Sequence, residues 1–195
     1  MHPDLTHDLF LVKEHVGLFK AANNFDVFDP ATGARLFECR EPRLGLLTKL
    51  LRFTDYKRLT PFQVELKAVD GTPLVTVRRG VTFFRSKVAV LDGRDQPIGS
   101  FRQRLLSIGG SFQVLDATDQ PLCELQGKWT GWDFRFVAGD RELASVSKKW
   151  AGLGKELFTS ADNYVLRIAA DVPKDSPLRL LILAAVLCID MVLKE

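Results

Sequence analysis

The most apolar segment of the chain runs from Leu178 to Leu193, and it limits what the rest of the sequence can fold into. Within it, Leu180–Ile189 holds aliphatic residues and one cysteine, Cys188. A helix that is apolar on every side must be enclosed by protein or by lipid. Ser176 and Pro177 predict where the helix begins, because a serine hydroxyl accepts a backbone N–H at the cap and proline suits the first helical turn.

The length and the charges of this segment favour enclosure by protein. Sixteen residues form a helix of about 24 Å, whereas a bilayer core is about 30 Å thick and needs about 20 residues. Arg179 and Asp190 are eleven residues apart and therefore share one helix face. Each lies at the end where the helix dipole disfavours its charge, which indicates specific partners in a protein wall. A buried helix is the favoured prediction, and a single-pass tail anchor is the alternative.

Turn sequences recur at a nearly constant spacing through the middle of the chain. Asp70, Asp92, Asp116 and Asp140 each stand in a short polar turn, at intervals of 22, 24 and 24 residues. Between the turns, apolar and polar residues alternate, as in Trp132–Phe136, and this period of two is typical of half-buried strands. The repeat predicts an antiparallel meander with two strands per unit, and the whole chain has room for ten to twelve strands.

So many antiparallel strands commonly close into a barrel, which removes the unpaired edges. Side chains alone cannot fill a barrel of about twelve strands, and the apolar helix is a suitable filling. We therefore predict one mainly β domain over residues 1–195: a closed antiparallel barrel around a buried hydrophobic C-terminal α-helix at residues 176–193. The residues expected on the buried helix are Leu180, Leu183, Leu187 and Asp190.

Several motifs resemble those of a known family. The run Ser147–Tyr164, followed by the apolar helix with its Ile189-Asp190 pair, resembles the C-terminal end of phospholipid scramblases. Asn24–Gly33 and Arg58–Phe62 are similar to both scramblases and the plant LURP-one-related proteins. The resemblance covers most of the chain and implies the tubby C-terminal-like fold, a twelve-stranded barrel around a hydrophobic helix. It also implies contact with phospholipid.

The sequence departs from this family at its cysteines and its calcium segment. The palmitoylated cysteine cluster and the proline-rich N-terminal region of scramblases have no counterpart here, and Cys39, Cys123 and Cys188 are isolated. Ser160 stands where the first aspartate of the proposed calcium segment would be, which leaves Asp162, Asn163 and Asp171. A missing carboxylate weakens hard-cation binding. No cofactor is therefore certain, and calcium is only a doubtful expectation.

Catalytic motifs do not emerge from the sequence. All three histidines fall within the first fifteen residues, and no GxSxG, HExxH or GxGxxG is present. We predict a protein that is not an enzyme. The N-terminus lacks the basic and apolar regions of a secretory signal, so a cytoplasmic protein is expected, with a peripheral place on the cytosolic membrane face.

Basic residues are the remaining candidates for function. One interpretation is a patch that binds anionic phospholipid headgroups, made by Arg78, Arg79, Arg102, Arg104, Lys148 and Lys149. The other is an ordinary solvated sheet face. An alternative function is a soluble barrel that binds a protein or a small ligand, and a third is lipid scrambling through an inserted helix. The net charge of +3 is mild and no basic run is present, so nucleic acid is not an expected partner.

Overall fold

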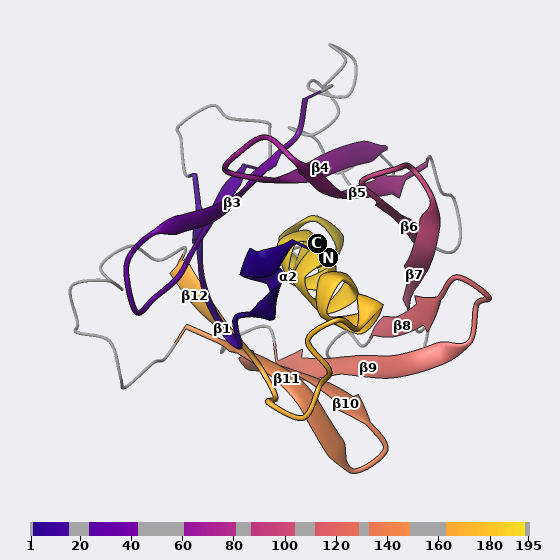
Figure 1. The fold of residues 1–195 in the computed structure, drawn as a ribbon. Coiled ribbons are helices and arrows are strands. Elements are labelled where there is room, and N and C mark those ends of the chain that lie inside the picture. The colour runs from indigo at the N-terminus through magenta and orange to yellow at the C-terminus, as the bar shows by residue number, and fades with distance from the viewer. Residues whose placement is uncertain are drawn as a thin grey trace.

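The computed structural model of the chain describes residues 2–15, 24–42, 61–80, 87–103, 112–128, 133–148 and 163–193, without the side chains of residues 103, 128 and 188–193. Twelve antiparallel strands form a closed barrel in which each strand pairs with its neighbours in sequence and β1 pairs with β12 (Figure 1). The strands are β1 (Leu9–Glu14), β2 (Phe25–Phe28), β3 (Arg35–Arg40), β4 (Phe62–Ala68), β5 (Pro73–Arg79), β6 (Lys87–Asp92), β7 (Pro97–Gln103), β8 (Phe112–Asp116), β9 (Pro121–Lys128), β10 (Asp133–Ala138), β11 (Arg141–Ser147) and β12 (Asn163–Ile168). The predicted fold class is confirmed.

Alternating sequence places apolar side chains inside the barrel. In β4, Phe62, Val64 and Leu66 are buried, whereas Gln63 and Glu65 between them are only partly buried and face outward. Successive side chains of a strand point to opposite faces, so this pattern fixes which side of the sheet forms the core. Bulges in several pairs, such as the one between Val90 and Leu91 described for β6 and β7, shift the register locally.

The helix α2 (Pro177–Leu193) lies in the centre of the barrel (Figure 1). Ser176 caps it as predicted, because its Oγ accepts the backbone N–H of Leu178 at 3.2 Å. Every residue from Leu181 to Leu187 is buried, so the protein encloses this part of the helix on all sides. Gly99 of β7 permits a close approach: a Cβ there would lie 2.9 Å from a methyl carbon of Leu181.

Among the helix residues expected to be buried, Leu183 and Leu187 are almost fully covered, and Leu180 is partly buried against the core. The side chain of Asp190 lies outside the described residues. No helix in the described part of the chain has both the length and the apolar character to cross a membrane.

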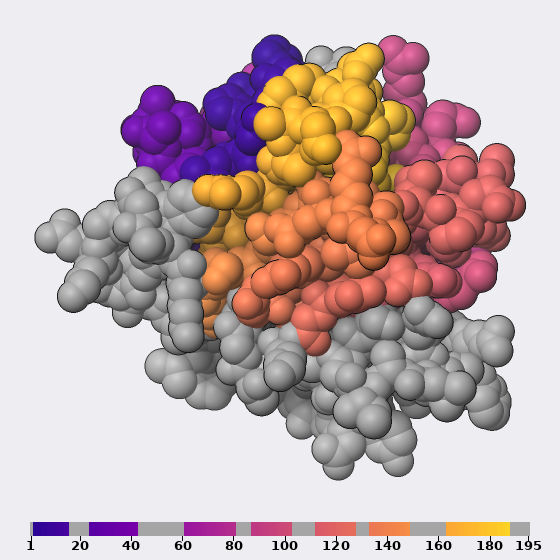
Figure 2. Space-filling view, turned by 90° about the horizontal axis from the view of Figure 1, so that it is seen from below, coloured from indigo at the N-terminus to yellow at the C-terminus, as the bar shows by residue number. Residues whose placement is uncertain are grey.

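Arg179 has the specific partners that its position predicted. Its side chain is 1% exposed and donates hydrogen bonds to the carbonyls of Leu5, Val172 and His7 and to the carboxylate of Asp8. The carbonyls of Leu5 and His7 belong to the N-terminal segment around the short 3₁₀ helix η1 (Pro3–Thr6). This segment and the chain leading into α2 therefore lie side by side at one end of the barrel (Figure 2).

In two of the four repeated turns, an aspartate at the start of the turn caps it in the same way. One carboxylate oxygen of Asp92 accepts hydrogen bonds from the backbone N–H groups two and four residues later, at 2.8 and 2.9 Å. Asp116 makes the same two hydrogen bonds at the same distances. Three residues after each of them, Asp95 and Asp119 adopt left-handed backbone conformations, with φ of 59° and 63°. The aspartates of the other two hairpins occupy different turn positions. The sequence repeat thus identifies all four turns but overstates their likeness.

Candidate functional site

Basic side chains gather on the outer face of β5, β6 and β7. Arg78 of β5 and Arg102 of β7 face outward, with side chains 46% and 41% exposed. Lys87 of β6 pairs with Arg102 in the sheet and joins them on this face. Arg79 does not, because it is 4% exposed and its guanidinium carbon lies 4.8 Å from the centre of the Phe62 ring. Its assignment to a surface patch is therefore corrected.

Turn aspartates cover these basic side chains. Arg78 lies 3.5 Å from Asp95 and also donates to Gln63 at 3.1 Å. The Nζ of Lys87 lies 2.7 and 2.8 Å from the two carboxylate oxygens of Asp119, and the Nη2 of Arg102 lies 4.0 Å from the second of them. The hydrogen bond from Lys87 is the main reason that the pKa of Asp119 lies below its ordinary value. The basic face therefore has internal counterions.

None of the other expected headgroup residues that the structure describes lies on this face. Lys148 follows the end of β11, which β8, β9 and β10 separate from β7. Arg104 and Lys149 lie outside the described residues. Within the part of the chain that the structure describes, the predicted patch therefore reduces to Arg78 and Arg102, and Lys87, a basic residue at the start of β6, joins them.

The structure does not bring the expected calcium ligands together. Asn163 begins β12 and is buried, whereas Asp171 follows the other end of that strand and forms an ion pair with Arg141 at 2.9 Å. A six-residue strand is about 20 Å long, so one ion cannot bind both residues. Asp162 lies outside the described residues. In the described ranges, no group of three potential metal ligands is suitably placed.

Charge is distributed unevenly along the barrel axis. Antiparallel pairing of consecutive strands puts the described hairpin turns, the N-terminal segment and the entry to α2 at one end, which we call the turn end. Acidic residues crowd this end: Asp4, Asp8, Asp29, Asp70, Asp92, Asp95, Asp116, Asp119, Asp140, Asp171 and Asp175. Arg94 and Lys174 are among the few cations in the same turns. The turn end is therefore rich in acidic residues, although Asp8, Asp95, Asp119 and Asp171 form ion pairs with Lys174, Arg78, Lys87 and Arg141.

The remaining strand termini, such as Glu14, Arg79 and Lys128, lie at the opposite end of the barrel. The sequence between these termini falls outside the described residues and comprises six segments: 16–23, 43–60, 81–86, 104–111, 129–132 and 149–162. They contain all three tryptophans and ten basic residues against three acidic ones: Lys20, Arg43, Lys49, Arg52, Lys57, Arg58, Arg85, Arg104, Lys149 and Lys155, against Asp55, Glu156 and Asp162. Ten of the 27 basic residues of the chain thus belong to the sequence between these strand termini.

A charged cluster on the outer face of β2 and β3 was not predicted from the sequence. Asp26 faces outward but is 8% exposed, because His15 and Arg40 cover it at 2.7 Å each. Burial alone would raise the pKa of Asp26, but the hydrogen bonds from Arg40 and His15 outweigh burial and hold the pKa below its ordinary value. The alternation of β2 places Asp26 outside, yet only the register between strands shows which partners it meets.

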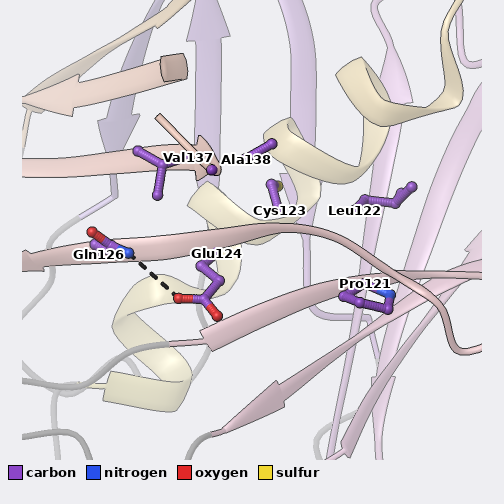
Figure 3. A pocket seen from close by; sticks show the side chains of 8 residues that line it. Pro121, Leu122, Cys123, Glu124, Gln126, Val137 and Ala138 are labelled. Carbon is purple, nitrogen blue, oxygen red and sulfur yellow. Dashed lines mark hydrogen bonds between the residues drawn. The ribbon is translucent and has the colours of Figure 1, made fainter. Parts of the chain in front are cut away.

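A pocket of about 490 Å³ lies where β9 and β10 separate (Figure 3). Their pairing ends at Val137 opposite Glu124, so the first residues of β9 and the last of β10 form its walls. Leu122 and Val137 contribute apolar surface, and Gln126 donates a hydrogen bond of 3.4 Å to Glu124 on the polar side. This volume lies within the range of small-ligand sites.

A closed barrel of twelve antiparallel strands around a C-terminal helix defines the tubby C-terminal-like class of fold. The Scramblase family model matches residues 12–195, and the chain belongs to this family. Membership suggests a function related to lipids, and barrels of this kind are generally non-enzymatic.

Two individual proteins show the range of this similarity. The chain is 22% identical over 174 residues to altered inheritance rate of mitochondria protein 25 of Saccharomyces cerevisiae. The match covers 76% of the chain but 53% of that protein, so the chain spans about half the length of this relative. A crystal structure of an Arabidopsis thaliana protein superposes with a TM-score of 0.56 at 18% identity, over 97% of this chain and 94% of the other. That likeness shows the fold alone.

Proposed function

We propose that this protein is a non-enzymatic, scramblase-like protein that binds anionic phospholipid at the cytosolic face of a membrane. We further propose that the end of the barrel opposite the turn end faces the membrane. The polarity of charge along the barrel carries this proposal, because eleven aspartates mark one end and an anionic surface repels them. Basic segments attract anionic headgroups by roughly 1 kcal/mol for each lysine or arginine near the surface.

The composition of the segments that join the strands at the opposite end supports this orientation. Their ten basic residues are interspersed with leucine and phenylalanine, as in the sequence from Arg43 to Phe53. Trp129 and Trp150 belong to these segments, and tryptophan is enriched where protein meets the membrane interface. Basic and aromatic residues in the same segments suit a surface of anionic lipid better than a solvated protein face.

The position of α2 bears on lipid movement between leaflets. Residues Leu181–Leu187 are enclosed by the strands, so a spanning role for α2 would require the barrel to open and its apolar interior to lose its filling. We therefore propose that any movement of lipid takes place at the surface of an intact barrel. Peripheral association of this kind predicts that a carbonate wash releases the protein from membranes.

Vesicle binding tests the proposal. The protein is mixed with phosphatidylcholine vesicles that contain or lack phosphatidylserine, and the bound fraction is measured at several salt concentrations. We expect binding only to the anionic vesicles, and it should weaken as salt screens the charges. Absence of binding at low salt would overturn the proposal.

A matched pair of variants tests the orientation. Arg52→Glu with Lys57→Glu reverses two charges in a segment assigned to the membrane end, and Arg35→Glu with Arg94→Glu reverses two near the turn end. Both variants change the net charge of +3 by the same amount. We expect the first pair to lose most of the binding and the second pair to retain most of it. Equal losses would mean that net charge alone governs binding, and the orientation would be wrong.

A second candidate function rests on the pocket between β9 and β10. The protein could instead serve as a soluble barrel that binds a small ligand or a protein segment at Leu122, Glu124 and Val137. This function predicts that the protein ignores vesicles, and that Val137→Glu abolishes ligand binding without altering the fold. The vesicle assay therefore separates the two candidates.

A further inference from the structure

Three donor side chains converge on one point of the outer barrel face. Lys87 of β6 and Arg102 of β7 are paired across the two strands, and Ser100 lies two residues before Arg102 on the same outward side. Ser100 is 3% exposed, yet its hydroxyl donates toward this point. An ammonium, a guanidinium and a buried hydroxyl are the donor types that bind phosphate in proteins.

A carboxylate of the protein already occupies the point where these donors meet. Both oxygens of Asp119 lie within 2.8 Å of the Lys87 Nζ, the Ser100 Oγ donates to one of them at 3.4 Å, and Arg102 approaches the other at 4.0 Å. Asp119 reaches them from the turn between β8 and β9, where it adopts a left-handed conformation with φ of 63°. The turn therefore presents an anion to a site on another part of the sheet.

We propose that Lys87, Arg102 and Ser100 form a binding site for a phosphate monoester or diester, and that Asp119 occupies it as an internal competitor. The inference deepens the proposed function, on which it rests, because phosphate is the chemistry that phospholipid headgroups share. Lys87 and Asp119 are each 49% exposed, so an incoming phosphate can reach the ammonium as the turn moves aside. A phosphate monoester carries more negative charge than a carboxylate and offers more acceptor oxygens for the three donors.

The same arrangement occurs once more, 24 residues earlier, with one informative difference. Arg78 stands in the place of Arg102, Asp95 in the place of Asp119, and Thr76 in the place of Ser100. Lys87, however, is replaced by the neutral Gln63, which accepts a hydrogen bond from Arg78. The earlier copy thus has a competing aspartate but lacks the ammonium, and we expect it to bind phosphate weakly.

This internal repeat supplies a control for the experiment. Asp119→Asn removes the competing carboxylate, and asparagine tolerates the left-handed backbone of the turn. Asp95→Asn makes the same change, with the same gain of charge, at the copy that lacks the lysine. We expect Asp119→Asn to raise the affinity for phosphate about two- to fivefold, since an exposed ion pair of this kind is lost. Asp95→Asn should leave the affinity near that of the wild type.

The affinity is measured by titration with glycerol 3-phosphate and, in a second arm, with vesicles that contain phosphatidic acid. An increase for Asp119→Asn in both arms identifies a lipid headgroup as the ligand, and an increase with the soluble ester alone identifies a free phosphate. Addition of Lys87→Gln to Asp119→Asn should cancel the increase. An unchanged affinity in both arms, or an equal increase for Asp95→Asn, would overturn the proposal.

The result is separable from the test of the proposed function. The charge reversals at Arg52 and Lys57 lie in a segment assigned to the membrane end, whereas Asp119 and Lys87 lie on the side of the barrel. The variant with Arg52→Glu and Lys57→Glu can therefore lose vesicle binding whether or not Asp119→Asn binds the soluble ester more tightly. The soluble ester reports on the side site even if the protein binds no vesicles.

Discussion

Replacement of Arg179 by methionine should destabilise the whole barrel. The side chain is 1% exposed and supplies donors to Asp8 and to the carbonyls of Leu5, His7 and Val172. Methionine fills much of the same volume but donates nothing, so three carbonyls lose this hydrogen bond, each at a cost of roughly 1 kcal/mol. The N-terminal segment also loses its link to α2. We expect the free energy of unfolding to fall by about 3–5 kcal/mol.

Chemical denaturation measures this effect. With a slope of roughly 2 kcal/mol per molar urea, the midpoint of unfolding should fall by about 1.5–2.5 M when followed by circular dichroism. The matched control is Arg141→Met, because Arg141 is 53% exposed and its ion pair with Asp171 is reached by solvent. We expect the control to cost about 1 kcal/mol or less. If Arg179→Met costs less than about 1 kcal/mol, or no more than the control, the buried guanidinium does not hold the barrel end together.

Three further predictions concern other parts of the barrel. Gly99→Ala should lower the urea midpoint, because the new Cβ would lie 2.3 Å from the Leu115 carbonyl oxygen and force Leu181 of α2 to shift; a midpoint equal to that of the wild type would show that the interior is looser than described. Folding lowers the pKa of Asp26 from 3.8, so its contribution to stability is present above this pH and is lost as the pH falls below it. Asp26→Asn should therefore weaken the loss of stability at acid pH, and an unchanged dependence on pH would contradict the assignment. Burial raises the pKa of the Cys123 thiol to about 12, so maleimide at pH 8 should modify Cys123 slowly in the native protein and quickly in urea. Peptide mass spectrometry measures the modification, and rapid labelling of the native protein would refute the burial of Cys123.

The sequence predicted the architecture because periodicity and burial are local signals. Ser176 and Pro177 identified the start of α2, and its apolar character required the enclosure that the barrel provides. The alternation of β5 also predicts the burial of Arg79. Arg78 and Arg79 are adjacent in this strand, so only one of them can face outward. Val77 faces the core, which places Arg79 on the buried side.

The candidate site was harder to predict because it depends on strand register. Lys87 meets Arg102 only through the pairing of β6 with β7, and bulges shift that register. Asp119 comes from the turn between β8 and β9, 32 residues from Lys87 in sequence. The regular spacing of 24 residues was visible in the turns, yet it did not show that Asp119 folds back over an outer face. Ionic partners across a sheet are a tertiary property, and a single sequence does not contain them.

Closure of the barrel between β1 and β12 has a consequence for biosynthesis. The first strand leaves the ribosome about 150 residues before the strand that completes its pairing, and α2, which fills the interior, emerges later still. Until then the growing sheet has two open edges and an apolar face without a partner, and such non-local pairing is slow to form. The barrel can therefore close only after β12 has emerged, and its interior is filled only after α2 has followed. An apolar helix that emerges last must find the interior of a nearly complete sheet before the fold is finished.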